Sequence, residues 1–321
     1  MRTVIRSLGI LGAVCVFTLA PGGASGGEKF PASPIEAIVS WPAGGGTDNA
    51  ARNALQFVEK DLGQKINVVN IPGGGGAIGY VQGAKRKADG YHWMTLQFDI
   101  LSVQAQGLAP VSHADFDTIA MFADQPVVLL VKNDSPFKSL DDFVKAAKER
   151  NLKIGGASVA GVWHQAAHLM TKTLGINYTY IPFSGIVEVL PAILGKHIDA
   201  GVCFLSGTSG SLKAGDVRIL AVMANERLKA FPQVPTFKEL GHNIQYVGFY
   251  GMAMPKGAPK DAVSIVSAAF ERASKNPTYQ ADANAKELNP VYLGPEQSRK
   301  FLNEMYPTVE RLSKEIAATT K

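Results

Sequence analysis

Apolar residues alternate along the chain between short continuous runs and helical spacing. The runs IEAIVSW (35–41), INVVNI (66–71) and HWMTLQF (92–98) are typical of buried strands. Apolar positions 51, 55, 58 and 62 lie on one face of a helix that we expect to begin with Thr47 as its N-cap. A second helix is expected over residues 79–88. This alternation predicts a parallel sheet with helices on its faces.

The same pattern restarts after the apolar run at 126–136. The spacing predicts further strands at 152–156, 178–183, 197–204 and 217–223, and helices at 139–150, 162–174, 187–194 and 209–214. A long apolar strand at 246–255 is followed by helices at 260–275, near Tyr279 and at 295–316. The sequence therefore predicts a second α/β unit and a helical C-terminal segment.

Two extended segments, 126–131 and 246–254, bracket this second unit. We expect an α/β fold of two lobes between which the chain crosses twice, with Gly248 and Gly251 allowing the second segment to bend. Residues 28–125 would form the first lobe, residues 126–250 the second lobe with the hinge strands, and residues 251–321 a return to the first. Ligand sites prefer such clefts and the carboxyl ends of parallel strands.

Residues 1–25 have the organisation of a signal peptide. Arg2 and Arg6 precede an apolar stretch (8–20), and the small residues around Ala24 suit cleavage, so we expect export. Cys203 is then the only cysteine left, which excludes an internal disulfide and leaves the core alone to stabilise the fold. No other apolar run approaches the length of a membrane-spanning helix, so we expect a soluble mature protein.

Composition and charge argue against a nucleic-acid partner. Hydrophobic residues make up 46% of the chain and charged residues 18%, as in an ordinary globular protein. The net charge is only +5, and no stretch combines dense Lys and Arg with aromatic residues. We therefore expect no nucleic acid among the partners.

Four glycine-rich loops fall where strands are expected to end and helices to begin. They are AGGG (43–46), PGGGGAIG (72–79), GGASVAG (155–161) and FSG (183–185). Backbone N–H groups and helix N-termini in such loops attract anionic oxygens. Glycines also make tight turns without any ligand, but four such loops, two in each lobe, favour a carboxylate site built without arginine.

One glycine motif also fits nucleotide binding. GGGAIG (74–79) matches G-x-G-x-x-G, and Asp99 follows about 20 residues later. A single match is a weak signal, and an exported protein has little access to nicotinamide cofactors. No G-K-[ST] follows any glycine run, which excludes a P-loop. We expect no cofactor.

A secreted serine hydrolase is the alternative function. GASVA (156–160) is similar to a nucleophile elbow with Ser158 as the nucleophile, and Asp199 and His242 follow in the order of a hydrolase triad. Whether these three side chains meet in space is left open by the sequence. We favour a binding protein that is not an enzyme.

Two histidines and a cysteine are candidates for metal binding or catalysis. His164 and His168 lie four residues apart, as a pair of metal ligands would, but no carboxylate or cysteine accompanies them at ligand spacing. We expect no metal, a solvated His168 and a His164 near the ligand. Cys203 has no evident paired base, so we expect a small buried residue that lines the cleft.

Several of these motifs together resemble the substrate-binding proteins of tripartite tricarboxylate transporters, the Bug family. The resemblance rests on PIEAIVSWPAGGGTDNAAR, LGQKINVVNIPGGGGAIG, KADGYHW, VLLVKNDSPFKSLDDF, GGASVAGVWHQAA, VEVLPAILGKHIDAGV and YGMAMPKGAP, which occur in the family's order. It implies a monomeric, type II-like periplasmic binding protein whose two lobes close on a small ligand, usually an organic carboxylate. It also implies delivery of the ligand to a permease with one large and one small integral-membrane subunit.

The resemblance implies ligand-binding residues in four loops, and we add Cys203, Phe204 and Tyr250 as residues expected to line the cleft. They are Trp41, Ala43, Gly44, Gly45, Gly46, Thr47 and Asp48; Gly75, Gly76 and Ala77; Ser158, Ala160, Gly161, Val162, Trp163 and His164; and Phe183, Ser184, Gly185, Cys203, Phe204 and Tyr250. Some family members place an acidic residue where Cys203 and Phe204 stand here, which argues against an amino-acid ligand. The aromatic residues of this set are expected to wall the cleft, which would suit an aromatic or longer apolar carboxylate.

Overall fold

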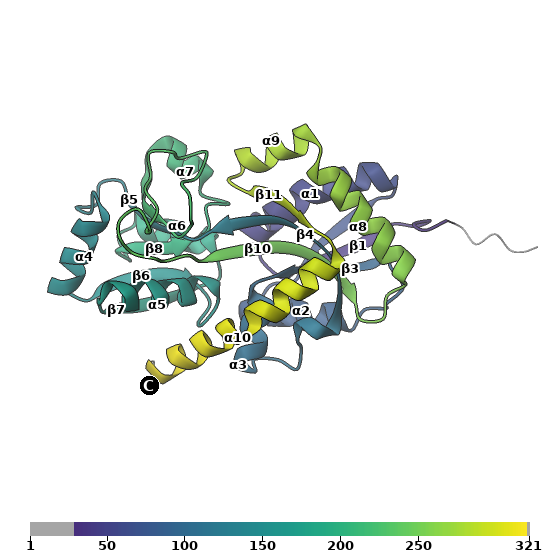
Figure 1. The fold of residues 1–321 in the computed structure, drawn as a ribbon, viewed down its shortest axis with the longest axis horizontal. Helices are drawn as coiled ribbons and strands as arrows, with labels where there is room; N and C mark the ends of the chain where they lie inside the picture. The colour runs from purple at the N-terminus through teal and green to yellow at the C-terminus, as the bar shows by residue number, and fades with distance from the viewer. Residues whose placement is uncertain (1–28, 320–321) are drawn as a thin grey trace, which may run out of the picture.

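The structure is a computed structural model that describes residues 29–319 (Figure 1). The predicted signal peptide (1–25) lies outside the described residues. Within residues 29–319 the strands form one six-stranded and one five-stranded sheet, which confirms the expected two-lobed α/β architecture. No helix in this part of the chain is long and apolar enough to cross a membrane.

The six-stranded sheet, with the helices packed on it, is called lobe 1. Its strand order is β11-β4-β10-β3-β1-β2, and it contains β1 (Ile35–Val39), β2 (Ile66–Asn70), β3 (His92–Gln97), β4 (Phe116–Pro126), β10 (Val247–Pro255) and β11 (Asn289–Leu293). β1 pairs in parallel with β2 and β3, whereas β10 runs antiparallel to β3 and β4. Burial of β10 from its second residue onward indicates that both faces of this sheet are covered.

The five-stranded sheet, with its helices, is called lobe 2. Its strand order is β7-β6-β8-β5-β9, and it contains β5 (Val128–Lys132), β6 (Leu152–Ala157), β7 (Tyr178–Phe183), β8 (Ala200–Cys203) and β9 (Val217–Val222). β6 is parallel to β7 and β8, whereas β5 is antiparallel to β8 and β9. The parallel strands bring the loops that follow β6, β7 and β8 to one edge of the sheet.

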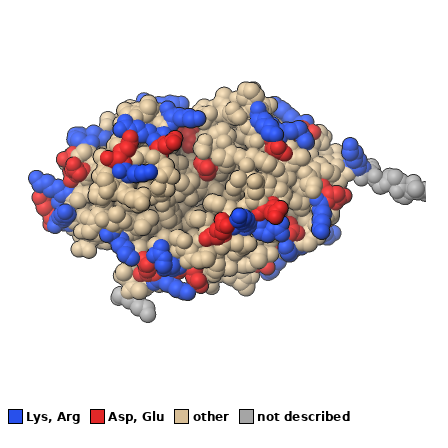
Figure 2. All heavy atoms as spheres, in the orientation of Figure 1, with Lys and Arg blue, Asp and Glu red and all other residues tan. Residues whose placement is uncertain are grey.

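The helices divide between the two lobes (Figure 1). Lobe 1 carries α1 (Gly46–Leu62), α2 (Ala77–Ala84), α3 (Asp99–Gln106), α8 (Lys260–Ser274), α9 (Pro277–Ala285) and α10 (Pro295–Thr319), with 3₁₀ turns at η1 (Gly74–Gly76) and η2 (His113–Asp115). Lobe 2 carries α4 (Leu140–Glu149), α5 (Val162–Leu174), α6 (Ile186–Leu194) and α7 (Ser209–Ala214). On the face shown in Figure 2, acidic and basic side chains are interspersed and do not gather into a single basic patch.

Most of the predicted elements are present, but three were missed and one cap was wrong. The sequence pattern did not predict α3, β11 or the first ten residues of β4. Thr47 is not the N-cap of α1, because Gly45 occupies that position and Thr47 lies within the helix. The Thr47 hydroxyl instead donates to Oε1 of Gln97 at 2.6 Å, which ties α1 to the end of β3.

The chain passes between the two sheets at two adjacent places. Val127 joins β4 to β5, and Tyr246 immediately precedes β10. Three backbone hydrogen bonds connect Val127, Tyr246 and Met223 with one another: Val127 N to Tyr246 O (2.9 Å), Met223 N to Val127 O (2.8 Å) and Tyr246 N to Met223 O (3.0 Å). Each passage is therefore shorter than the expected hinge segments, while the predicted residue boundaries of the lobes remain a prediction.

The two glycines expected to let the second passage bend lie where the structure leaves little space for a side chain. A Cβ on Gly248 would overlap the ring of Phe204 in lobe 2, and a Cβ on Gly251 would lie 2.9 Å from the carbonyl oxygen of Leu96. Neither glycine has a positive φ. Their small size thus allows close approach, with Gly248 admitting the Phe204 ring against lobe 1.

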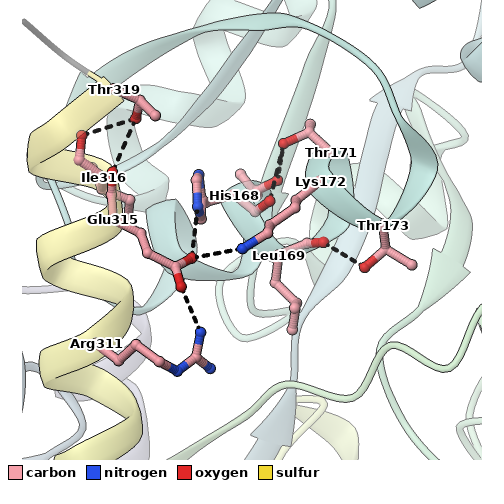
Figure 3. Close-up of polar contacts among 10 residues, drawn as sticks. His168, Leu169, Thr171, Lys172, Thr173, Arg311, Glu315, Ile316 and Thr319 are labelled. Carbon is pink, nitrogen blue, oxygen red and sulfur yellow. Dashed lines mark hydrogen bonds and ion pairs between the residues drawn. The ribbon is translucent and has the colours of Figure 1, made fainter.

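Helix α10 fastens the two lobes together at its C-terminal end (Figure 3). The Glu315 carboxylate of α10 contacts Lys172 Nζ at 3.1 Å and His168 Nε2 at 3.3 Å, both on α5, and Arg311 Nη1 at 2.8 Å. Partial burial opposes ionisation of Glu315, but its cationic neighbours hold its pKa at about 2. His168 is therefore not the solvated side chain we expected, since only 12% of it is exposed.

A buried amide continues this connection. Gln165 on α5 is fully buried, and its Nε2 lies 3.2 Å from the Ser102 hydroxyl of α3 and 3.3 Å from the Ser313 hydroxyl of α10. Its Oε1 accepts a hydrogen bond from the Tyr246 hydroxyl. In this arrangement the lobes are in contact, and their contact includes specific polar bonds.

Replacing Glu315 by Gln should weaken the fastening of α10 to α5. Three partners share this carboxylate, so we expect a loss of about 1 kcal/mol in the free energy of unfolding, the upper end for an ion pair near the surface. Urea unfolding at low and high salt measures the loss, which high salt should abolish by screening. Glu310→Gln is the control, because its exposed pair with Lys314 (3.1 Å) lies on the same helix. An equal loss in both variants would contradict the interlobe role of Glu315.

Candidate functional site

A pocket lies between the two lobes at the carboxyl ends of their parallel strands. It encloses about 470 Å³ of space, including the part open to solvent. Its lining residues come from both lobes: Trp41, Pro42, Gly45, Gly46, Thr47, Gln97, Asp99 and Tyr250 from lobe 1, and Ala157, Val162, Trp163, Gly185, Ile186, Val187 and Phe204 from lobe 2. Residues far apart in sequence thus form one cavity in the position where ligand sites of two-lobed α/β proteins are expected.

Three helices begin at this pocket without a side-chain cap. The N-caps of α1, α5 and α6 are Gly45, Gly161 and Gly185, which have no side chain that could accept a hydrogen bond from the helix. Away from the pocket, the side chains of Ser139 and Asn276 cap α4 and α9, whereas α2, α7 and α8 also begin without a side-chain cap. The first backbone N–H groups of an α-helix have no partner within the helix, so the pocket receives unsatisfied donors and the positive ends of helix dipoles.

A chain of hydrogen bonds links two of these helix starts across the cleft. Thr47 on α1 donates to Gln97 Oε1 at 2.6 Å, and Gln97 Nε2 donates to Asp99 Oδ2 at 3.0 Å. The backbone N–H of Val162, at the start of α5 in lobe 2, donates to the Asp99 carboxylate. The floor of the pocket is therefore polar and joins the lobes.

Asp99 is the charged residue of this floor. Its side chain is buried, and burial raises its pKa to about 6 although hydrogen bonds from Val162 and Gln97 favour the carboxylate. None of the pocket-lining residues in the described chain is Lys, Arg or His. The pocket thus offers anions only neutral donors, and it holds one carboxylate without a cationic partner.

Aromatic rings form the wall of the pocket. The ring centroids of Trp163 and Phe204 are 5.7 Å apart, and the two rings are nearly perpendicular. The ring centroids of Phe204 and Tyr250 are 6.0 Å apart. The indole Nε1 atoms of Trp41 and Trp163 are buried and have no hydrogen-bond partner within residues 29–319. A buried N–H without a partner costs about 1–3 kcal/mol, so both indoles are suited to donate to a bound molecule.

The Asp48 carboxylate stabilises the first glycine loop through hydrogen bonds within lobe 1. The Asp48 carboxylate accepts from Gly44 N, Arg52 Nε and Asn70 Nδ2, each at 2.9 Å. Burial opposes ionisation of Asp48, but these donors lower its pKa below the ordinary value. Gly45 N–H is also occupied, because it donates to Pro42 O at 3.2 Å. The N–H groups left for a ligand are those from Gly46 onward.

His164 stabilises the loop between β6 and α5. Its Nδ1 accepts from Ala160 N at 3.0 Å, and its ring stacks on Tyr180 with centroids 3.7 Å apart. Burial lowers the pKa of His164 to about 4, so the ring is neutral at physiological pH. Ser158 and Ala160 adopt positive φ values of 48° and 51°, which are strained for residues with a side chain. His164 therefore supports a strained loop and does not line the pocket.

The structure brings together part of the predicted residue set. Trp41, Gly45, Gly46, Thr47, Val162, Trp163, Gly185, Phe204 and Tyr250 line the pocket. The predicted residues that do not line it are Ala43, Gly44, Asp48, Gly75, Gly76, Ala77, Ser158, Ala160, Gly161, His164, Phe183, Ser184 and Cys203. Gly75 and Ser158 instead line a separate hollow beside α3, which Asp99 also reaches.

Six lining residues were not predicted: Pro42, Gln97, Asp99, Ala157, Ile186 and Val187. Gln97 ends β3, and Asp99 begins α3 two residues later. A signal for both was present, because ligands bind at the carboxyl ends of parallel strands. The predicted site loops are rich in glycine, whereas the connection after β3 has none.

The arrangement gives no support to the alternative chemistries. Asp199 forms two hydrogen bonds with the Arg150 guanidinium (2.6 and 3.2 Å) and one with Lys153 N (2.8 Å), so its carboxylate is not directed to a histidine. Among the described residues, no group of three or more His, Cys, Asp or Glu is placed to hold a metal ion. Cys203 is buried, as expected, but behind the pocket wall, and burial raises its pKa to about 12.

Comparisons with known proteins agree on one family. Residues 50–318 match the family described as "Tripartite tricarboxylate transporter family receptor". The protein BugT of Bordetella pertussis is 28% identical over 285 residues, which cover 86% of this chain and 86% of BugT. A TctC solute binding protein from Polaromonas, solved without ligand, is 30% identical with a TM-score of 0.70, covering 89% of this chain and 100% of that one.

A further solved structure has a ligand. MatC from Rhodopseudomonas palustris, solved with bound malate, is 25% identical with a TM-score of 0.81, covering 88% of this chain and 100% of that one. The family match extends over most of the chain and includes the starts of α5 and α6, which face the pocket. The chain therefore belongs to the tripartite tricarboxylate transporter receptor family, and it is a solute-binding receptor rather than an enzyme.

Proposed function

We propose that this chain captures a small organic carboxylate between its two lobes and delivers it to a tripartite tricarboxylate-type membrane transporter. In this proposal the N-terminal signal peptide directs the mature receptor to the periplasm, where it acts as a monomer. The large and small integral-membrane subunits of the permease are its partners. No cofactor or metal takes part, and no bond of the ligand is broken.

The observation that carries the proposal is the set of uncapped helix starts at the pocket. α1 in lobe 1 and α6 in lobe 2 both begin there after glycine N-caps that accept no side-chain hydrogen bond. A carboxylate oxygen is the ordinary partner for such N–H groups, and helix dipoles favour its negative charge. The two unpaired indole N–H groups of Trp41 and Trp163 add donors from both lobes.

The malate-bound relative supports the choice of ligand class. MatC was solved with a small dicarboxylate in the same fold, and the similarity covers its whole length. The pocket of this chain is lined largely by apolar and aromatic side chains, among them Val162, Ile186 and Phe204. A carboxylate with an apolar or aromatic body fits this lining better than a compact, highly charged acid, because an apolar wall cannot hydrate additional charges.

Closure of the lobes is the proposed mechanism of capture. A carboxylate that accepts from α1 and α6 together touches both lobes, so it binds the closed arrangement more tightly than an open one. Bending at Val127 and Tyr246, where the chain passes between the sheets, would open the pocket. The permease would then recognise the closed, loaded receptor.

A thermal-shift screen of mono-, di- and tricarboxylates tests the function. A ligand present at 100 times its dissociation constant should stabilise the receptor by about 2.7 kcal/mol. Ester hydrolysis is assayed alongside with Ser158→Ala as the comparison. No stabilisation by any carboxylate would refute the proposed function, and an esterase activity that Ser158→Ala abolishes would favour the hydrolase.

Gly46→Ala should weaken carboxylate binding. A Cβ on Gly46 would overlap the Ser206 hydroxyl of lobe 2 and lie 3.2 Å from the Tyr250 hydroxyl, so it should obstruct closure at the start of α1. Calorimetry with the best acid from the screen should show a loss of about 10-fold or more in affinity, or about 1.4 kcal/mol. Gly210→Ala on α7 is the control, because its Cβ meets nothing within 4 Å. Equal affinities for the two variants would contradict a ligand site at the start of α1.

Binding should also draw the lobes together in solution. Small-angle scattering of the receptor with and without the same acid should show a smaller radius of gyration when the pocket is occupied, because the ligand stabilises the closed state. The scattering is recorded at saturation and repeated for Gly46→Ala at the same ligand concentration. An unchanged radius for the saturated wild type would mean that the lobes do not close on the ligand.

A further inference from the structure

We infer that Asp99 selects carboxylates that also carry a hydrogen-bond-donating substituent, a hydroxyl or an amine, next to the apolar body. This inference rests on the proposed function, since it concerns the ligand of the same pocket. It names a ligand subclass: 2-hydroxy or 2-amino acids and related acids with a donor group, in preference to the unsubstituted acid.

Asp99 lies at the pocket between the two lobes. Asp99 begins α3 in lobe 1, lines the pocket, and reaches the start of α5 in lobe 2. Its oxygen Oδ1 lies so near the opposite lobe that a Cβ on Gly161 would be only 3.1 Å away. A ligand held at the starts of α1 and α6 would share this pocket with Asp99.

The hydrogen-bonding capacity of Asp99 is only partly used by the protein. A carboxylate accepts about four hydrogen bonds through its two oxygens. Gln97 Nε2 and the Val162 backbone N–H are donors from neighbouring residues, and the backbone N–H of Asp99 itself also contributes. Since Asp99 lines the cavity, an unused acceptor position is available to a ligand O–H or N–H.

No basic side chain neutralises this carboxylate within the described part of the chain. The ionisable groups whose charge couples to Asp99 are the four tyrosines Tyr80 on α2, Tyr180 on β7, Tyr246 at the hinge and Tyr250 on β10. Burial raises the pKa of each of them, so none is charged at physiological pH. A donor or cation on the ligand would supply the partner that the protein omits.

The same charge disfavours other ligands. A second ligand carboxylate placed at Asp99 would meet a like charge in an apolar cavity, which is unfavourable. The first carboxylate escapes this repulsion when it lies at the uncapped starts of α1 and α6. The absence of an acid at Cys203 and Phe204 therefore does not exclude amino-acid ligands, because the end of β3 supplies one.

The test compares acids that differ only in the substituent at C2. Succinate, malate and aspartate form one series, and 3-phenylpropanoate, 3-phenyllactate and phenylalanine form a second with an aromatic body. Calorimetry at pH 7.5 should show that, in the series that binds, the acid with a hydroxyl or amino group has an affinity about 10-fold or more above that of the unsubstituted acid. In Asp99→Asn this advantage should fall below about threefold. Asp124→Asn is the control, since Asp124 is also a partly buried carboxyl with a raised pKa but pairs with Asn289 at the edge of lobe 1.

A stability measurement separates selection from a purely structural role. Because the folded-state pKa of Asp99 is about 6, above its ordinary 3.8, ionisation opposes folding increasingly as the pH rises between these values. Asp99→Asn should therefore raise the thermal midpoint of the unliganded receptor at pH 7.5 relative to the wild type and reduce its decline between pH 4 and 7. The hydrogen bonds of Gln97 can be kept in Asp99→Asn if its amide group rotates. Its Nε2 then donates to the Thr47 hydroxyl, which can also accept, and its Oε1 accepts from the new side-chain amide.

The outcomes distinguish the inference from the proposed function. If unsubstituted acids bind and their hydroxyl and amino derivatives bind no more tightly, the proposed function stands and the role of Asp99 is refuted. A selectivity that survives in Asp99→Asn, or a lower midpoint of that variant at pH 7.5, also refutes it. If no acid of either series binds, the proposed function fails, and the inference fails with it.

Discussion

The structure depends on how the first backbone N–H groups of three helices are satisfied. α1, α5 and α6 all begin at the cleft after glycine N-caps. Asp99 provides an acceptor for α5 from across the cleft. In the proposed function, the starts of α1 and α6 are left to a carboxylate that enters the pocket.

Several buried polar groups lie close to these donors. Asp99 is buried without a cation, and the indole N–H groups of Trp41 and Trp163 have no partner in the described chain. Such groups are unfavourable in an empty receptor and become favourable when a ligand pairs with them. The bonds of Gln165 and the cluster around Glu315 lie on the other side of α5 and hold the lobes in register.

The fold was more predictable from the sequence than the site. Apolar periodicity located α5 at its observed ends, because its buried face repeats at helical spacing. It missed α3, which is only eight residues long and lacks a capping side chain, and β11, an edge strand that contains Pro290. Glycine content identified the loops of α1 and α6 but overlooked Gln97 and Asp99, whose importance depends on a contact with Val162 from the other lobe. Such a contact follows from the three-dimensional approach of the lobes, which no local pattern encodes.

The most direct measurement of the central claim is the response of individual backbone amides to a carboxylate. In ¹H–¹⁵N spectra of the labelled receptor, titration with a bound acid should shift the amide signals of Gly46 and Thr47 in lobe 1 together with those of Ile186 and Val187 in lobe 2. The downfield proton shifts expected of new hydrogen bonds to a carboxylate should follow one binding curve in both lobes. Shifts confined to one lobe, or absent at the starts of α1 and α6 when the acid is bound, would contradict capture by the helix N-termini.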